Sequence, residues 1–90
     1  MISVQVSYSG QARALAGTSA EPIGIAQPHT VTGLLHEIAR RHEPLRALLF
    51  NGTSAPRAGL LIFVDDEQSD AETMLHDGCN VDIVPPISGG

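Results

Sequence analysis

Alternating apolar and polar residues open the chain. From Ile2 to Tyr8 every second residue is apolar and the residues between are Ser or Gln, which is the period of a strand with one face against a core. This pattern ends at Gly10, residues 11–16 predict a short helical turn, and the apolar residues around Gly24 predict a second strand. We expect the two strands to form a hairpin with a long loop.

The period then changes to that of a helix. Between Val31 and His42 apolar residues recur three and four positions apart, with charged residues on the other side, which predicts an amphipathic helix of about three turns. Glu37 and Arg41 are one turn apart in the order that favours an ion pair. Pro44 ends the helix because the residue before a proline avoids helical geometry.

Three further apolar segments predict strands. The runs Leu48–Phe50 and Leu60–Val64 are too short for separate helices, and a loop rich in Gly and Pro separates them. The acidic stretch from Asp65 to Glu72 is expected to be a solvated loop, and residues 81–84 predict the last strand. The chain therefore reads strand, strand, helix, strand, strand, strand.

This order predicts an α+β domain over residues 1–84. One main helix would pack on one face of a mixed sheet of four to five strands, and the β-grasp, ubiquitin-like fold is the natural candidate. The whole chain has 90 residues, which suffices for one modest core and excludes the large enzyme architectures.

Charge and cysteine content narrow the classes of partner. Five arginines, no lysine and ten acidic residues give a net charge of −5, and no basic run is present, so we expect no nucleic-acid partner. No segment has the length of a membrane span and the N-terminus lacks a secretory pattern. The lone Cys79 cannot form an internal disulfide. A cytoplasmic location without membrane contact is expected.

The common catalytic signatures are missing from the sequence. It contains no Gly-rich phosphate loop, no HExxH and no GxSxG, and its four histidines lack the spacing of a metal site. We therefore expect no catalysis by the isolated chain, no metal site and no permanently bound cofactor.

The end of the chain is its most informative segment. The last strand leads through two prolines, which favour extended backbone, into the ending PPISGG. Glycines lack side chains and can pass through a channel too narrow for other residues, so the α-carboxylate can reach the catalytic groups of another protein. We predict a flexible tail over residues 85–90 that threads a partner's active site, consisting of Pro85, Pro86, Ile87, Ser88, Gly89 and the reactive Gly90.

Four segments resemble the MoaD/ThiS family of ubiquitin-like sulfur carriers: the tail VDIVPPISGG, the preceding MLHDGCNV, the helix TVTGLLHEIARRH and the GQARALAG after the first strand. The resemblance covers essentially the whole chain, and its PP-x-x-GG ending is the most specific part. The length and the ending are most similar to the MoaD-type small subunit of molybdopterin synthase. Cys79 departs from the family pattern, since many relatives have an acidic residue after Asp-Gly.

The resemblance implies a mechanism. An ATP-dependent, ubiquitin-activating-type adenylyltransferase would adenylate the carboxylate of Gly90, and sulfur would displace AMP to leave a thiocarboxylate. In a molybdopterin synthase the tail would enter the large, MoaE-type subunit and donate sulfur to the cyclic pyranopterin precursor. Gly90 would then carry the reagent, while the partner would supply acid–base catalysis.

Three alternatives remain at this point. The chain is a sulfur carrier for cysteine synthesis, thiamine synthesis or tRNA thiolation, a ubiquitin-like modifier joined to target lysines through Gly90, or a β-grasp interaction module with an inert tail. Because the sequence has no lysine, it cannot form chains of itself through lysine isopeptide bonds.

The run from residue 60 to residue 64 also predicts a partner surface. Successive strand residues point to opposite faces, and one helix covers only one face, so one set of apolar side chains must face away from it. A loop over residues 51–59 that covers this set is the alternative. The candidate partner interface consists of Leu60, Ile62, Val64, Val81 and Ile83.

Overall fold

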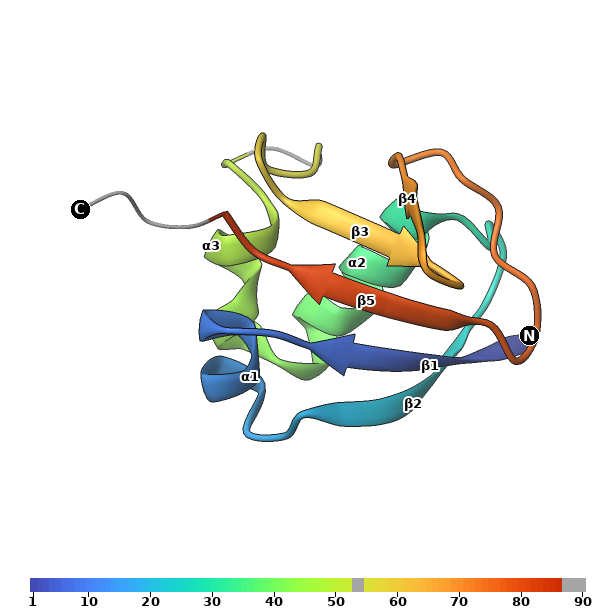
Figure 1. Cartoon of the computed structure of the whole chain (residues 1–90), viewed down its shortest axis with the longest axis horizontal. Coiled ribbons are helices and arrows are strands. Elements are labelled where there is room, and N and C mark those ends of the chain that lie inside the picture. The colour runs from blue at the N-terminus through green and yellow to red at the C-terminus, as the bar shows by residue number, and fades with distance from the viewer. Residues whose placement is uncertain (53–54, 87–90) are drawn as a thin grey trace.

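The computed structural model describes residues 1–52 and 55–86 (Figure 1). Helices lie on one face of a five-stranded sheet, and the other face is left open in Figure 1. The elements in chain order are β1 (Ile2–Tyr8), α1 (Gln11–Ala16), β2 (Ala20–Ile25), α2 (Val31–Arg41), the 3-10 turn η1 (Glu43–Leu45), α3 (Arg46–Leu49), β3 (Leu61–Val64), β4 (Glu67–Ser69) and β5 (Asn80–Val84).

The sheet is mixed and its last strand in sequence lies at its centre. The strand order is β2-β1-β5-β3-β4. Strand β1 pairs antiparallel with β2 and parallel with β5, and β3 pairs antiparallel with both β4 and β5. This arrangement confirms the predicted mixed sheet with one main helix. It also places the strand that leads into the tail between two hydrogen-bonded neighbours.

Helix α2 has the boundaries that its sequence favours. Thr30 Oγ1 accepts a hydrogen bond from the backbone N–H of Gly33 at 3.1 Å, which caps the N-terminus of the helix. Glu37 Oε2 lies 2.9 Å from Arg41 Nε, so the predicted ion pair is confirmed. The helix ends at Arg41, two residues before the turn that contains Pro44.

The prediction of a strand at Leu48–Phe50 is wrong. This run belongs mostly to α3, and Phe50 makes only an isolated bridge with Pro56. The reason lies in the preceding turn, where Leu45 is fully buried one helical turn before the fully buried Leu49. Residues four positions apart lie on the same face of a helix, so the helix buries both leucines. The strand prediction considered only the three consecutive apolar residues and not this spacing.

The acidic stretch also contains an unexpected strand. Residues 67–69 form β4, which pairs with β3 at the edge of the sheet, so the prediction that residues 65–72 form only a loop is wrong. Charged and polar side chains are common on edge strands because they discourage pairing with other chains. A polar sequence is therefore compatible with an edge strand, although it lacks the apolar alternation from which strands are predicted.

The core forms between α2 and the inner face of the sheet. The helix contributes Val31, Leu34, Leu35 and Ile38, each fully buried. Facing strands contribute fully buried or nearly fully buried side chains, which include Val4, Val6, Ile23, Ile25, Ile62, Val81 and Ile83. Within residues 1–52 and 55–86 no helix combines the length and the apolarity needed to cross a membrane.

Candidate functional site

The base of the predicted tail packs against the domain. Strand β5 ends at Val84, after which Pro85 is buried and Pro86 is half-buried. Gly59 has φ 87°, and a Cβ built on it would lie 3.4 Å from Pro86 Cβ, so the loop before β3 lies against Pro86. Residues 87–90, which include Ile87, Ser88, Gly89 and Gly90, lie outside the described residues. Their roles stay predictions.

The residues proposed for the partner interface lie mainly in the core. Ile62, Val64, Val81 and Ile83 are each at most 9% exposed, and Leu60 is partly buried against the same cluster. Their side chains point toward α2 because β3 and β5 present alternate residues to opposite faces. The prediction that this set faces a partner is therefore wrong, and the alternate residues occupy the outer face.

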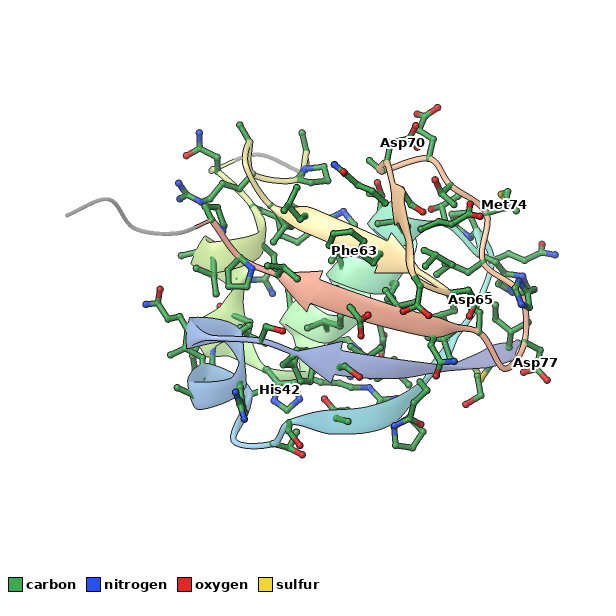
Figure 2. The ribbon with its side chains drawn as sticks, viewed as in Figure 1. His42, Phe63, Asp65, Asp70, Met74 and Asp77 are labelled. Carbon is green, nitrogen blue, oxygen red and sulfur yellow. The ribbon has the colours of Figure 1, made fainter. Side chains whose placement is uncertain are left out.

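The outer face carries a small apolar patch beside the tail. Leu61 is 38% exposed and pairs with Val84 across β3 and β5, and both Val84 and Phe63 are half-buried. Figure 2 labels Phe63 on β3, the strand next to β5. We name Leu61, Phe63 and Val84 the outer patch. This patch adjoins the end of β5, the strand that leads into the tail.

A surface hollow adjoins the base of the tail. Its volume is about 400 Å³, and Pro86 forms part of its wall. The other lining residues come from α1, from the turn before α3, from α3 itself and from the loop before β3: Gln11, Leu15, Pro44, Ala47, Leu48 and Arg57. We name this set the tail-base hollow. Sequence reasoning missed it because its residues are far apart along the chain.

Three side chains form a polar cluster near the end of β1. The Tyr8 hydroxyl donates a hydrogen bond to Glu21 Oε2 at 2.6 Å, and Nε2 of His42, which is labelled in Figure 2, lies 2.6 Å from the same oxygen. Burial and the bond to Glu21 raise the pKa of Tyr8 well above its usual range. Burial alone would raise the pKa of Glu21, but the hydrogen bonds from Tyr8 and His42 outweigh it and lower that pKa. The cluster joins β1, β2 and the end of α2.

Replacing Glu21 with Gln is expected to lower the free energy of unfolding by about 1 kcal/mol at neutral pH. Because the folded-state pKa of Glu21 is depressed, this stabilisation is present above its unfolded value of about 4.3 and is lost as pH falls through the folded-state pKa. The difference in melting temperature between wild type and Glu21→Gln should therefore shrink between neutral and acidic pH. Glu72→Gln, at an exposed site, is the matched control. A difference that stays constant with pH would contradict this assignment.

The remaining candidate ligands do not assemble into a site. The described part of the chain contains no group of three or more His, Cys, Asp or Glu side chains that could hold a metal ion. Cys79 is 1% exposed, and burial raises the pKa of its thiol. A buried thiol with a raised pKa is a poor nucleophile.

Comparison with known proteins decides the family. The profile of the ThiS family matches residues 6–90, which is nearly the whole chain and includes the PPISGG ending. The chain belongs to the ThiS family. This confirms the resemblance to the MoaD/ThiS group of ubiquitin-like sulfur carriers and modifiers. The search of curated protein sequences found no match.

Solved structures agree with the family. A Pyrococcus furiosus structure, assigned to molybdopterin converting factor subunit 1, is 30% identical with a TM-score of 0.80, and the match covers 97% of this chain and 100% of that chain. The structure of SAMP1 from Haloferax volcanii is 18% identical with a TM-score of 0.88, covering 98% and 99% of the two chains. A chain in the BexX/CysO complex of Amycolatopsis orientalis is 23% identical with a TM-score of 0.73, covering 97% and 99%. The predicted ubiquitin-like β-grasp fold of this ThiS-family protein is confirmed.

Proposed function

We propose that the chain is a sulfur carrier whose C-terminal Gly90 carboxylate is adenylated and then converted to a thiocarboxylate. The observation that carries the proposal is the ThiS-family match, which extends through Gly90. The fold supports it, because the central strand β5 leads directly into the PPISGG segment. A carrier needs a stable body and an accessible terminus, and it needs no catalytic side chains of its own.

The chemistry explains why partners are required. A carboxylate is a poor electrophile, so an ATP-dependent adenylyltransferase must first convert it to an acyl adenylate, releasing pyrophosphate. Hydrosulfide then forms a bond to the carbonyl carbon while AMP leaves, and loss of the remaining S–H proton gives a thiocarboxylate. The resulting thiocarboxylate is the donor, and the enzyme that consumes it supplies acid–base catalysis. ATP is therefore a substrate of the activating enzyme, and the carrier needs no resident cofactor.

The pathway that we propose is molybdopterin synthesis in the cytoplasm. The support is the 30% identical Pyrococcus furiosus structure, which is assigned to a molybdopterin converting factor subunit and matches over its full length. The acceptor would then be a large, MoaE-type subunit that receives the tail. The outer patch of Leu61, Phe63 and Val84 is the surface that we propose for docking, replacing the buried set, and a standard interface would bury on the order of 800 Å² on this side.

Intact mass tests this proposal. The carrier is produced together with a ubiquitin-activating-type enzyme and a sulfurtransferase, and the expected product differs from the free chain by exchange of one oxygen for one sulfur. A loaded carrier that supplies sulfur to the pyranopterin precursor with a MoaE-type subunit would support the molybdopterin pathway. Covalent adducts on other proteins, with no sulfur exchange, would favour the modifier function. An unchanged mass would contradict both.

A further inference from the structure

Charge is distributed unevenly along the long dimension of the protein. Strands β1 and β5 run parallel, so both begin at one end of the molecule and end near the base of the tail. Six of the ten acidic residues lie between Asp65 and Asp77, and these include Asp77, whose Oδ1 accepts a hydrogen bond from Ser3 N at the start of β1. Figure 2 shows Asp65 and Asp77 toward the start of β5, away from its end at Val84, and Asp70 beside β4. One end is therefore strongly acidic.

The end of the molecule near the base of the tail is rich in arginine. The five arginines lie on α1, in the last turn of α2, on α3 and in the loop before β3, that is, among the elements near the end of β5. The nearby glutamates are already paired. Glu37 Oε2 lies 2.6 Å from Arg40 Nη2, and Glu43 Oε1 lies 3.1 Å from Arg46 Nε. Glu37 Oε2 also lies 2.9 Å from Arg41 Nε, so Arg40 and Arg41 share one carboxylate.

Two arginines at this end make no ion pair with any of the residues that the structure describes. Among the described residues neither Arg13 nor Arg57 has a carboxylate within ion-pair distance, while Arg57 Nε donates a hydrogen bond to the carbonyl oxygen of Ala47 at 3.1 Å. That bond ties the half-buried Arg57 side chain to α3. A guanidinium that one hydrogen bond already holds in place loses less conformational freedom when its other N–H groups bind a carboxylate.

Arg57 also lies in the tail-base hollow. The hollow has apolar walls from Leu15, Leu48 and Pro86, and Leu15 is 37% exposed. Its chemistry is therefore an apolar surface with one fixed positive charge. Because Pro86 forms part of the wall, a segment bound there would lie beside the base of the tail.

We propose that the tail-base hollow binds an acidic, partly apolar segment of the enzyme that adenylates Gly90, with Arg57 as the anchoring cation. This inference rests on the proposed function, because that enzyme must receive the tail. Apolar side chains of the segment fit against Leu15 and Leu48, and a carboxylate fits Arg57. The acidic segment of the enzyme also repels the acidic end of the carrier, which carries Asp65 and Asp77. This repulsion favours an approach in which the tail faces the enzyme.

The test uses adenylation by the ubiquitin-activating-type enzyme, followed as carrier-dependent exchange of pyrophosphate into ATP. Arg57→Glu should raise the KM for the carrier by at least about threefold at low salt, because rim charges mainly alter association. The kcat should not change, since Gly90 and the tail are intact. The effect should largely disappear near 1 M salt, where the Debye length is only about 3 Å.

Arg40→Glu is the matched control. It makes the same change in net charge, but Arg40 does not line the tail-base hollow, and Glu37 keeps its bond to Arg41. We expect this variant to raise KM by less than about twofold. Arg57→Gln removes the charge without reversing it and should have an intermediate KM. Melting temperatures establish that all three variants are folded.

Several results would overturn the inference. Equal KM values for Arg57→Glu and Arg40→Glu would show that only net charge matters. An unchanged or lower KM for folded Arg57→Glu and Arg57→Gln would show that no acidic segment binds there, and a change in kcat alone would also contradict docking. If the wild-type carrier is not adenylated at all, the proposed function itself fails and this inference fails with it.

Discussion

Deletion of Gly90 is expected to abolish sulfur loading completely while leaving the fold intact. The deletion removes the carboxylate that we propose is adenylated, and it shortens by one residue the tail that the proposed partner would have to position. Strand β5 ends at Val84, six residues before the C-terminus, so the deletion removes no residue from any strand of the sheet. The melting temperature should stay within about 2 °C of wild type.

Intact mass and thermal unfolding measure the two effects. Ser88→Ala is the control, because it changes the composition of the tail while keeping its length, and this variant should still accept sulfur. Full loading of the protein that lacks Gly90 would show that the reactive group is not the carboxylate of Gly90. A large fall in melting temperature would show that the terminus supports the fold.

Two neighbouring residues on β3 should respond to the same substitution in opposite ways. Ile62 is 5% exposed and faces the core, so Ile62→Asp buries a charge and should cost about 4 kcal/mol or more, much of the stability of a small domain. Leu61 is 38% exposed on the outer face, so Leu61→Asp should cost less than about 1 kcal/mol. Urea unfolding followed by circular dichroism measures both.

Leu61→Asp also tests the outer patch. With the fold intact, a charge placed beside Phe63 and Val84 should weaken binding to the acceptor subunit by about tenfold or more, because it disrupts an apolar contact. Unchanged affinity would mean that the interface lies elsewhere on the carrier. A folded and stable Ile62→Asp protein would contradict the orientation of β3.

Much of the fold could be predicted where the pattern of apolar and polar residues fits only one type of secondary structure. Polar residues alternate with apolar ones along β1, so its buried face is fixed, and the repeat from Val31 to Ile38 fixes the buried face of α2 in the same way. The PPISGG ending is the most specific part of the family resemblance, and it can be recognised from the sequence without a structure. For β1 and α2 the local sequence pattern and the tertiary structure agree.

The remaining parts depend on contacts that the local pattern does not contain. In β3 every residue is apolar, so the sequence could not tell which side of Leu61–Val64 faces α2, and the interface was assigned to the wrong side. Strand β4 is polar and exists because β3 offers an edge for pairing. The tail-base hollow requires α1, α3 and Arg57 to meet, which only the tertiary structure brings about.

The central place of β5 has a mechanical consequence. Its ladder with β1 runs from Asn80 to Ile83, and its ladder with β3 runs from Val81 to Val84. A pull on the C-terminus acts along the strand, so it loads both ladders in shear and does not peel them open one hydrogen bond at a time. For the sulfur carrier that we propose, this geometry would let the tail be pulled from a partner's channel while the sheet stays paired, so one molecule could serve in repeated rounds of loading and transfer.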